Sequence, residues 1–378
     1  MLLYFVILVF CIIFEFLPVF RNEKIKIIIC LIIGVFLCFG YMTGSDWRAY
    51  EVIYYDLDIK DPLRAEVEYG YHFYMLLFRL FSVDFWTFFI TTKVILYAIN
   101  IRFLMLYNKD KFYFTLAFFI SFFGLSLFID NPMRNLIAVS IFLFSIKYII
   151  QQRFIKYILI ILFASLFHIS TILIFPIYWL AKLSIEKKKL IAVYILFNIL
   201  LWVFDSQLRT LFNFETGITF IDSKISFYFG DNATGGIYTE NRIFSLGLMV
   251  RFLLFFVLVY SEKQIKDRFG IVFFNLVIIS FFFHRLGIGI PLFGRFLFFV
   301  SIPFTVVMID LINSFEMKSR PFYAIFVALI TFYTTYTTIT LDYKYVPYTN
   351  YLSYIMKKEK PSYYERSMYN FRNSPYAK

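Results

Sequence analysis

Charged side chains are what this sequence lacks most. Only 16% of its 378 residues are Asp, Glu, Lys or Arg, whereas 61% are hydrophobic and 23% are aromatic. A soluble globular protein carries about 25% charged residues, so the composition excludes that class. Apolar runs of about 20 residues recur along the whole chain, which is the length that a helix needs to cross a bilayer.

Cysteine and histidine are also scarce, with three residues of each kind. Cys11, Cys30 and Cys38 all lie in apolar segments, so we interpret them as buried thiols and not as a disulfide framework. The three histidines lack the spacing of zinc ligands. The sequence has no Walker loop, no GxGxxG element and no GxSxG element. We therefore expect no metal and no soluble cofactor.

The net charge of +12 would suggest a nucleic-acid partner in a soluble protein. Here the lysines stand in short loops between apolar runs, as the positive-inside rule requires, so we expect no nucleic acid. The pattern predicts an all-α, polytopic integral membrane protein with about 12 transmembrane helices. A shorter apolar stretch at 69–81 reads as an interfacial or re-entrant helix.

The predicted topology gives a single transmembrane domain at 1–341, with loops 43–68, 130–135, 205–245 and 284–295 outside the membrane. Residues 342–378 would form an amphipathic tail on the same outer side. Segment 157–183 determines the topology of the second half of the chain. It is long enough to cross the membrane once as a tilted span, but it could also cross twice as a hairpin. Its flanks are basic at both ends, with Lys156 before it and Lys187 after it. Both ends should thus be cytoplasmic, which favours a hairpin with His168 at its outer tip.

The two predicted sides of the membrane differ in their cations. The inside loops are rich in lysine, whereas the outer loops before the tail hold only two lysines, Lys60 and Lys224. Seven arginines fall in these outer loops: Arg48, Arg64, Arg134, Arg209, Arg242, Arg285 and Arg295. Arginine is preferred where a planar fork must grip phosphate or carboxylate, so a functional anion site is one explanation. Chance composition is the other.

Two residues are candidates for proton transfer. Asp46 follows the second apolar run and could act as a general base; it could equally cap a helix or pair with Arg48. His168 stands beside Ser170 and could take a proton from a sugar hydroxyl, or it could be a structural histidine.

Three arginines are candidates for binding a diphosphate. Arg134 stands at a predicted helix start, where a guanidinium and free N–H groups make an anion site. Arg285 and Arg295 flank a glycine-rich break at which the backbone can approach a ligand. Snorkelling or pairing with nearby acids is the alternative. Aromatic residues such as Trp47 and Tyr50 could stack on sugar rings or belong to an interface belt.

These residues also carry a resemblance. Gly44-Ser45-Asp46-Trp47 with Tyr50 resembles the G-x-D-x-x-x-Y segment of the EpsG-like, Wzy-type bacterial polysaccharide polymerases. Glu68-Tyr69-Gly70-Tyr71 resembles that family's Glu-x-Gly-aromatic segment. Arg134, followed later by Phe167-His168-Ile169-Ser170, resembles its arginine and F-H-x-S pair. The markers keep the family's order over residues 40–171, and the break at 285–295 extends the match more loosely.

The resemblance implies a GT-C-like glycosyltransferase of the bacterial inner membrane. Such an enzyme polymerises polyprenyl-diphosphate-linked oligosaccharide repeat units on the outer side of the membrane, without metal or nucleotide sugar. Asp46 or His168 would be the base, and Arg134, Arg285 and Arg295 would bind the diphosphate. The residues expected to contact the substrate are Arg48, Tyr50, Glu68 and Trp47.

The partners implied are membrane lipid, a flippase and a chain-length regulator. A transporter or flippase of the same lipid-linked units is the alternative from another class. A ligase of the O-antigen type has nearly the same chemistry, and acyl transfer using His168 with Ser170 is a weaker alternative.

Overall fold

The computed structural model describes residues 1–130, 132–204 and 245–377. Nearly all of the predicted outer loop 205–245 therefore lies outside the described residues, as does Asn131. Within the described ranges the regular elements are helices. One isolated antiparallel β-bridge pairs Gly40 with Asn350. The chain forms two compact units. Unit 1 comprises residues 1–148, 155–175 and 315–378, and unit 2 comprises residues 149–154 and 176–314.

Unit 1 holds both ends of the chain. Its elements are α1 (Leu2–Phe16), η1 (Pro18–Arg21), α2 (Glu23–Cys38), α3 (Trp47–Asp56), α4 (Tyr69–Leu80), α5 (Phe85–Tyr107), α6 (Phe112–Phe119), the π-helical η2 (Ile120–Ile129), α7 (Met133–Leu143), α8 (Ile146–Ile150, continuing into unit 2), α9 (Phe154–Ser165, entering from unit 2), η3 (Ile169–Ile174), α18 (Arg320–Leu341), η6 (Tyr343–Tyr345), α19 (Tyr351–Lys357) and α20 (Tyr363–Asn373).

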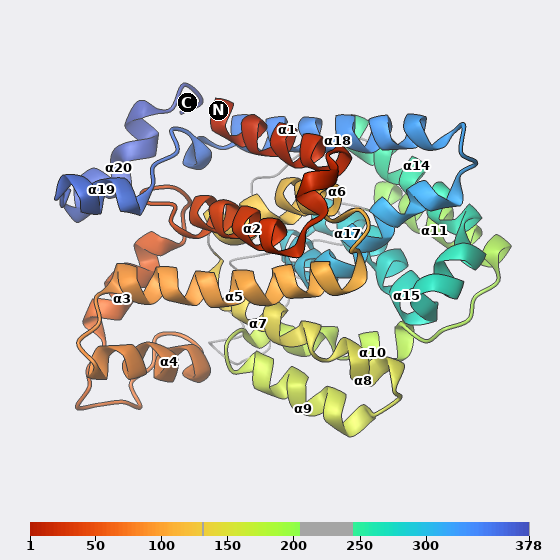
Figure 1. The fold of residues 1–378 in the computed structure, drawn as a ribbon. Helices are drawn as coiled ribbons and strands as arrows, with labels where there is room; N and C mark the ends of the chain where they lie inside the picture. Colours follow the sequence, from red (N-terminus) through yellow and green to blue (C-terminus); the bar gives the residue numbers. More distant parts are fainter. Residues whose placement is uncertain (131, 205–244, 378) are drawn as a thin grey trace. The chain divides into compact units, whose positions relative to one another are not determined.

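The interior of unit 1 is built around α6 and its π-helical continuation η2. α1 packs against α6 and α18, α2 packs along α5 and η2, and α18 also packs on η2 (Figure 1). Almost every side chain from Phe112 to Ile129 is buried. A helix that is apolar all round must be enclosed by others, which explains its central position.

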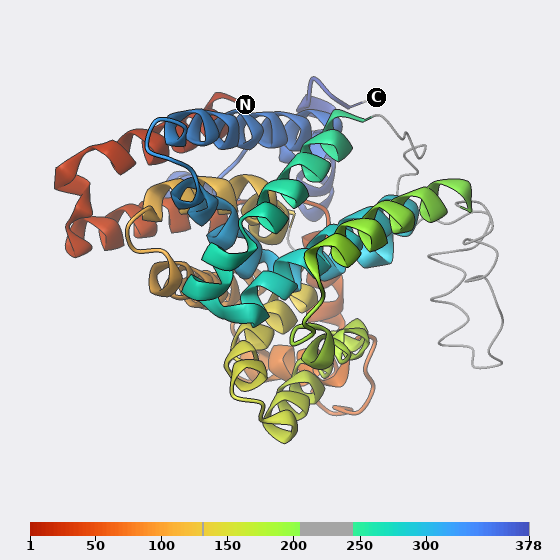
Figure 2. The same cartoon turned by 90° about the vertical axis from the view of Figure 1, so that its right-hand side faces the viewer.

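Unit 2 is helical as well. Its elements are α10 (Ile177–Leu180), α11 (Lys187–Val203), α14 (Leu246–Tyr260), α15 (Glu262–Gly289), α16 (Pro291–Phe296), η4 (Leu297–Val300), α17 (Ser301–Asp310) and η5 (Leu311–Ser314). α11, α14 and α15 pack together, and α15 also packs on α16 and α17 (Figure 2).

Two glycine positions shape α15. The helix is interrupted at Gly270, whose φ of 82° is left-handed and favours glycine. The break falls two residues after Arg268, close to the point where the charged start of α15 gives way to its apolar part. Farther along, a Cβ on Gly287 would lie 2.8 Å from the Cα of Gly294, so α15 and α16 meet backbone to backbone.

Six of the described helical stretches are long and apolar enough to cross a membrane. They are Phe85–Tyr107, Phe112–Ile129, Met133–Ile150, Glu262–Ile288, Leu292–Ser314 and Arg320–Leu341. Each contains most or all of one predicted span. The other predicted spans are helical but shorter, for example α1 with 15 residues and α11 with 17. The all-helical, multi-pass membrane class is thus confirmed for the described chain, whereas about 12 spans and a GT-C-like arrangement stay predictions.

Segment 157–183 folds back on itself. α9 ends at Ser165, and the Tyr157 hydroxyl donates a hydrogen bond to the Ile174 carbonyl at 3.0 Å. Phe154 packs on Tyr178 with ring centroids 5.1 Å apart. Residues before and after His168 therefore pair in reverse order, as a hairpin requires. The turn brings His168 to the end of α9.

α4 has the features of an interfacial helix. It is 12 residues long, which is too short to cross a bilayer. Its exposed apolar side chains recur with helical spacing at Tyr69, Phe73, Leu77 and Leu80, while His72 on another face is buried. This stripe agrees with the predicted interfacial or re-entrant helix at 69–81.

Candidate functional site

Glu68 is the centre of a polar cluster in unit 1. Its Oε2 accepts a hydrogen bond from Arg134 Nη1 at 2.5 Å, and its Oε1 lies 3.6 Å from His168 Nδ1. The Ile169 backbone N–H donates to the same Oε1 at 3.3 Å. Arg134 also donates from Nε to the Tyr50 hydroxyl at 3.3 Å. We call Tyr50, Glu68, Arg134 and His168 the Glu68 cluster.

Each member of the Glu68 cluster comes from a different part of the chain. Tyr50 lies in α3, Glu68 immediately before α4, Arg134 in the first turn of α7, and His168 between α9 and η3. Glu68, Arg134 and His168 stand where a helix begins or ends, and Tyr50 lies near the start of α3. The polar ends of these helices are thereby gathered at one place.

The partners of Glu68 keep its carboxyl ionised. Burial opposes ionisation, but the nearby His168 ring and the charge of Arg134 outweigh it and lower the pKa of Glu68 to about 2. At neutral pH Glu68 is therefore a carboxylate, and it can orient the imidazole of His168 through Nδ1. With Nδ1 toward Glu68, the opposite ring nitrogen, Nε2, is the one that would accept a proton if His168 acted as a base.

Asp46 lies directly before α3, at the edge of the cluster. Its side chain makes no capping hydrogen bond to α3, so the capping interpretation is wrong. The Ser45 hydroxyl donates to Asp46 Oδ1 at 3.2 Å and, more closely, to Asp130 Oδ1 at 2.8 Å. Burial raises the pKa of the Tyr50 hydroxyl, Arg134 opposes that rise and Asp46 adds to it. The electrostatic influence of Asp46 thus reaches the Tyr50 hydroxyl.

A second ion pair supports the Asp46 loop, and we did not predict it. Lys344 Nζ lies 2.9 Å from Asp130 Oδ2 and 2.8 Å from Asp342 Oδ2. Burial disfavours the charged amine, but the two carboxylates hold the pKa of Lys344 above its ordinary value. The Gly44 backbone N–H also donates to the Lys344 carbonyl at 2.9 Å. The one signal in the sequence is an Asp-x-Lys pair directly after the last predicted span.

Trp47 and Arg48, both expected to contact substrate, differ in burial. The Trp47 side chain is completely buried, so its indole faces protein and not solvent. It packs 5.3 Å from the Trp86 ring and 6.1 Å from the Tyr363 ring. The Arg48 guanidinium lies over the Trp47 ring at 5.9 Å and its side chain is half-buried. Trp47 therefore packs behind the site and supports it.

Arg285 and Arg295, the other predicted diphosphate ligands, belong to unit 2. Arg285 lies in α15 and is only 3% exposed, and Arg295 lies in α16 and is half-buried. The close approach of Gly287 and Gly294 lies between them in sequence. Their role in anion binding stays a prediction.

Gly70 fixes the distance between α4 and the end of α9. Its N–H donates to the Leu166 carbonyl at 2.8 Å, two residues before His168 in the chain. A Cβ at Gly70 would lie 2.7 Å from both the Cβ and the carbonyl oxygen of Leu166, a contact that real Cβ atoms essentially never make. Only glycine therefore lets the Glu68 and His168 segments approach this closely.

Replacing Gly70 by alanine should separate Glu68 from His168. We expect a loss of stability of about 1–3 kcal/mol, as for other overpacked positions, together with a large loss of any activity that needs both side chains. The measurement is thermal unfolding in detergent beside an activity assay. Gly247→Ala is the matched control, because nothing lies within 4 Å of a Cβ there. Equal behaviour of the two variants would contradict the role of Gly70.

No group of three or more His, Cys, Asp or Glu side chains that could hold a metal ion occurs in the part of the chain that the structure describes. The charged partners in the site are instead arginine, lysine and histidine. Catalysis that used these residues would stabilise a developing anion by hydrogen bonds and fixed positive charge.

Comparison with known proteins identifies the family. No curated protein and no solved structure matched the chain. The profile of the EpsG family matches residues 23–351, a range that contains Asp46, the whole Glu68 cluster and Lys344. This match covers most of the chain and confirms the resemblance found in the sequence motifs. The chain therefore belongs to the EpsG family, whose members are polysaccharide polymerases of the Wzy type.

Proposed function

We propose that this protein polymerises polyprenyl-diphosphate-linked oligosaccharide repeat units by glycosyl transfer on the outer side of the bacterial cytoplasmic membrane. Family membership supports a polymerase of polysaccharides. The observation that carries the finer proposal is the convergence of Glu68, Arg134 and His168, with Asp46 beside them. A base, a carboxylate that orients it and a fixed cation are what transfer from a diphosphate needs.

The proposed reaction uses His168 as general base. An acceptor hydroxyl gives its proton to His168 Nε2 while its oxygen attacks the anomeric carbon of the donor. The bond from that carbon to the diphosphate oxygen breaks, and the polyprenyl diphosphate leaves with the negative charge. Glu68, held ionised, stabilises the imidazolium that forms.

Arg134 is the proposed ligand of the leaving diphosphate in unit 1. Its Nε and Nη1 are used by Tyr50 and Glu68, and Nη2 makes no hydrogen bond to any described residue. A guanidinium anchored on two sides can present its third nitrogen to phosphate in a fixed direction. Arg285 and Arg295 are proposed as further diphosphate ligands on the sequence evidence alone. The positive charge of these arginines would make a metal ion unnecessary. A lipid-linked donor would likewise make a nucleotide sugar unnecessary.

Asp46 is the second candidate for the base, and pH separates the two assignments. A histidine base should place the acid limb of the pH–rate profile at a higher pH than a carboxylate base would, because the ordinary pKa of histidine is about 6.5 and that of aspartate is about 3.9. Arg48 and Tyr50 are proposed to contact sugar, whereas the buried Trp47 is proposed to support them from behind. A flippase that supplies the units and a chain-length regulator are the proposed protein partners.

The test is a reconstitution. Purified protein would be mixed with polyprenyl-diphosphate repeat units and no nucleotide sugar, and the products would be separated by length. A ladder of increasing length would support polymerisation. Single units that stay single but cross a liposome membrane would instead identify a transporter, and transfer to a lipid core would identify a ligase. Asp46→Ala, His168→Ala and Arg295→Ala should insert normally and yield single units only; long chains from all three would overturn the site assignment.

A further inference from the structure

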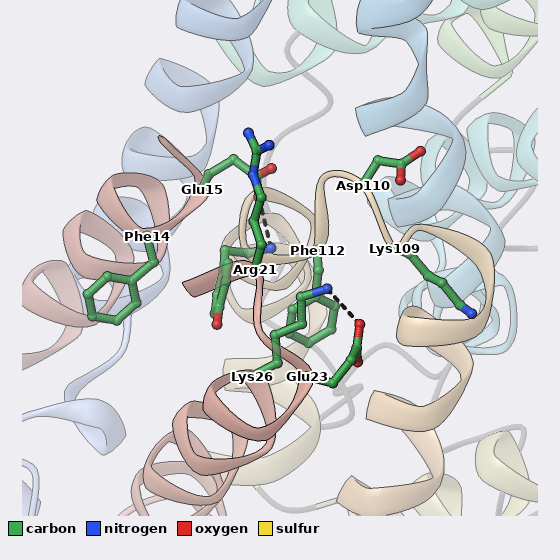
Figure 3. Close-up of a pocket in the computed structure, with 9 residues that line it drawn as sticks. Phe14, Glu15, Arg21, Glu23, Lys26, Lys109, Asp110 and Phe112 are labelled. Carbon is green, nitrogen blue, oxygen red and sulfur yellow. Dashed lines mark hydrogen bonds and ion pairs between the residues drawn. The ribbon is translucent and has the colours of Figure 1, made fainter. Parts of the chain in front are cut away.

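A cavity of about 420 Å³ lies in unit 1 where α1 ends, α2 begins and the loop from α5 enters α6 (Figure 3). No member of the Glu68 cluster lines it. Its lining includes six charged residues, Glu15, Arg21, Glu23, Lys26, Lys109 and Asp110. Three acids face three bases, so the sum of charges alone does not select a ligand.

The contacts of these side chains show which of the six charges are already neutralised within the protein. Glu15 Oε2 accepts hydrogen bonds from the backbone N–H groups of Tyr113 and Phe114, at 3.0 and 3.1 Å, where α6 starts. Glu23 is paired with Lys26 at 3.1 Å, as Figure 3 shows. These two carboxylates are therefore already compensated.

Two cations at the cavity are not compensated in this way. Arg21 and Lys109 are both exposed. The charge of Arg21 acts on the Glu15 carboxylate, but no ion pair or side-chain hydrogen bond within the described residues holds either cation. Asp110, by contrast, already interacts with another group. The guanidinium and the ammonium can therefore still turn toward an anion, and this pair suits phosphate, which accepts hydrogen bonds from several directions.

The surface beside the cavity is apolar. On α1, Phe10 is 50% exposed and Phe16 is 74% exposed, and on α2 Ile27 and Ile28 are both more than half exposed. In a multi-pass membrane protein such a surface faces acyl chains. The cavity therefore stands where a lipid-facing surface meets a charged loop, which is where a phospholipid places its headgroup.

We propose that this cavity binds the phosphate of an anionic membrane phospholipid, whose acyl chains run along the exposed apolar faces of α1 and α2. Basic pockets between membrane helices bind anionic headgroups in this manner on the cytoplasmic side. The loops concerned, at 21–26 and 108–111, are the ones that the positive-inside pattern predicts to be cytoplasmic. The site is separate from the Glu68 cluster and does not depend on the proposed polymerase reaction.

The test is lipid binding by the full-length protein in neutral detergent, measured by native mass spectrometry. The probes are phosphatidylglycerol, phosphatidylcholine and inorganic phosphate. We expect phosphatidylglycerol to bind more tightly than phosphatidylcholine. Arg21→Gln/Lys109→Gln should weaken phosphatidylglycerol binding by roughly tenfold or more, because each basic residue near a headgroup contributes independently.

Matched variants keep this test decisive. Arg153→Gln/Lys188→Gln removes the same charge from exposed positions outside the cavity and should leave binding unchanged. Asn22→Asp keeps the side-chain cap of α2 while adding a negative charge beside Arg21, so it should weaken binding without unfolding the helix. Unchanged phosphatidylglycerol affinity in both cavity variants would overturn the proposal. Binding of inorganic phosphate with the same dependence on Arg21 and Lys109, but no preference for the anionic lipid, would overturn the lipid as the source.

Discussion

Glu68→Gln should lower polymer synthesis by at least about a hundredfold, the lower end of what a positioned acid–base group contributes. The amide keeps the size of the side chain but loses the charge that holds Arg134 and faces His168 Nδ1. The imidazolium formed during proton transfer would lose its counter-charge, and the Arg134 guanidinium would turn elsewhere. Product length and initial rate in the reconstituted assay measure the effect.

Glu66→Gln is the matched control for this substitution. Glu66 lies two positions earlier and is exposed, so the same chemical change there should leave the rate within about twofold, as for most surface substitutions. A Glu68→Gln enzyme that retained normal rate and product length would remove Glu68 from the site. Normal insertion and folding of the variant should be checked by gel filtration and thermal unfolding.

The stabilising effect of ionised Glu68 should depend on pH in a defined window. The folded-state pKa is about 2, below the value of about 4.3 that an unfolded glutamate has. A carboxyl whose pKa is lowered by folding stabilises the folded state above its unfolded pKa and loses that contribution as pH falls toward the folded value. The stability difference between wild type and Glu68→Gln should therefore be constant above about pH 5 and shrink between about pH 4 and pH 2. A difference that stayed unchanged down to pH 2 would contradict ionised Glu68 as its source.

Arg366→Met should destabilise the protein by about 3–5 kcal/mol, the cost of leaving a buried charge without its partner. Arg366 in α20 holds Glu51 in α3 with two hydrogen bonds, of 2.6 and 2.9 Å, and both side chains are less than 10% exposed. Its guanidinium also lies 5.5 Å from the Trp47 ring and 5.8 Å from the Trp86 ring. Loosening α20 should release α3, so polymer synthesis should fall with the melting temperature.

A double variant separates the ion pair from its packing. Glu51→Met/Arg366→Met removes both charges and should be more stable than Arg366→Met alone, because no unpaired charge stays buried. Arg372→Met, in the same helix but exposed, should change the melting temperature little. A double variant that is no more stable than Arg366→Met would mean that the charge pairing is not the source of the effect.

The sequence allowed part of this site to be predicted, and the physical reason is clear. Asp46, Glu68, Arg134 and His168 each stand at the end of an apolar run, and ends on one side of a membrane collect at one surface. Their motifs were also visible because each is local. Long-range ion pairs leave no local signal, which explains why Lys344 with Asp130 and Arg366 with Glu51 were missed. Burial of Trp47 depends on those same partners and was missed for the same reason.

The hydrogen bond from Gly44 to Lys344 sets a parity rule for the whole membrane topology. Two loop residues in contact outside the bilayer lie on the same side of it, so the chain between them must cross the bilayer an even number of times. Counting segment 157–183 as a hairpin keeps the number of predicted crossings between Gly44 and Lys344 even, whereas counting it as a single span makes the number odd. The contact of the Tyr4 hydroxyl with the Tyr345 carbonyl agrees with the prediction that the start of the chain and the segment after α18 lie at the same side.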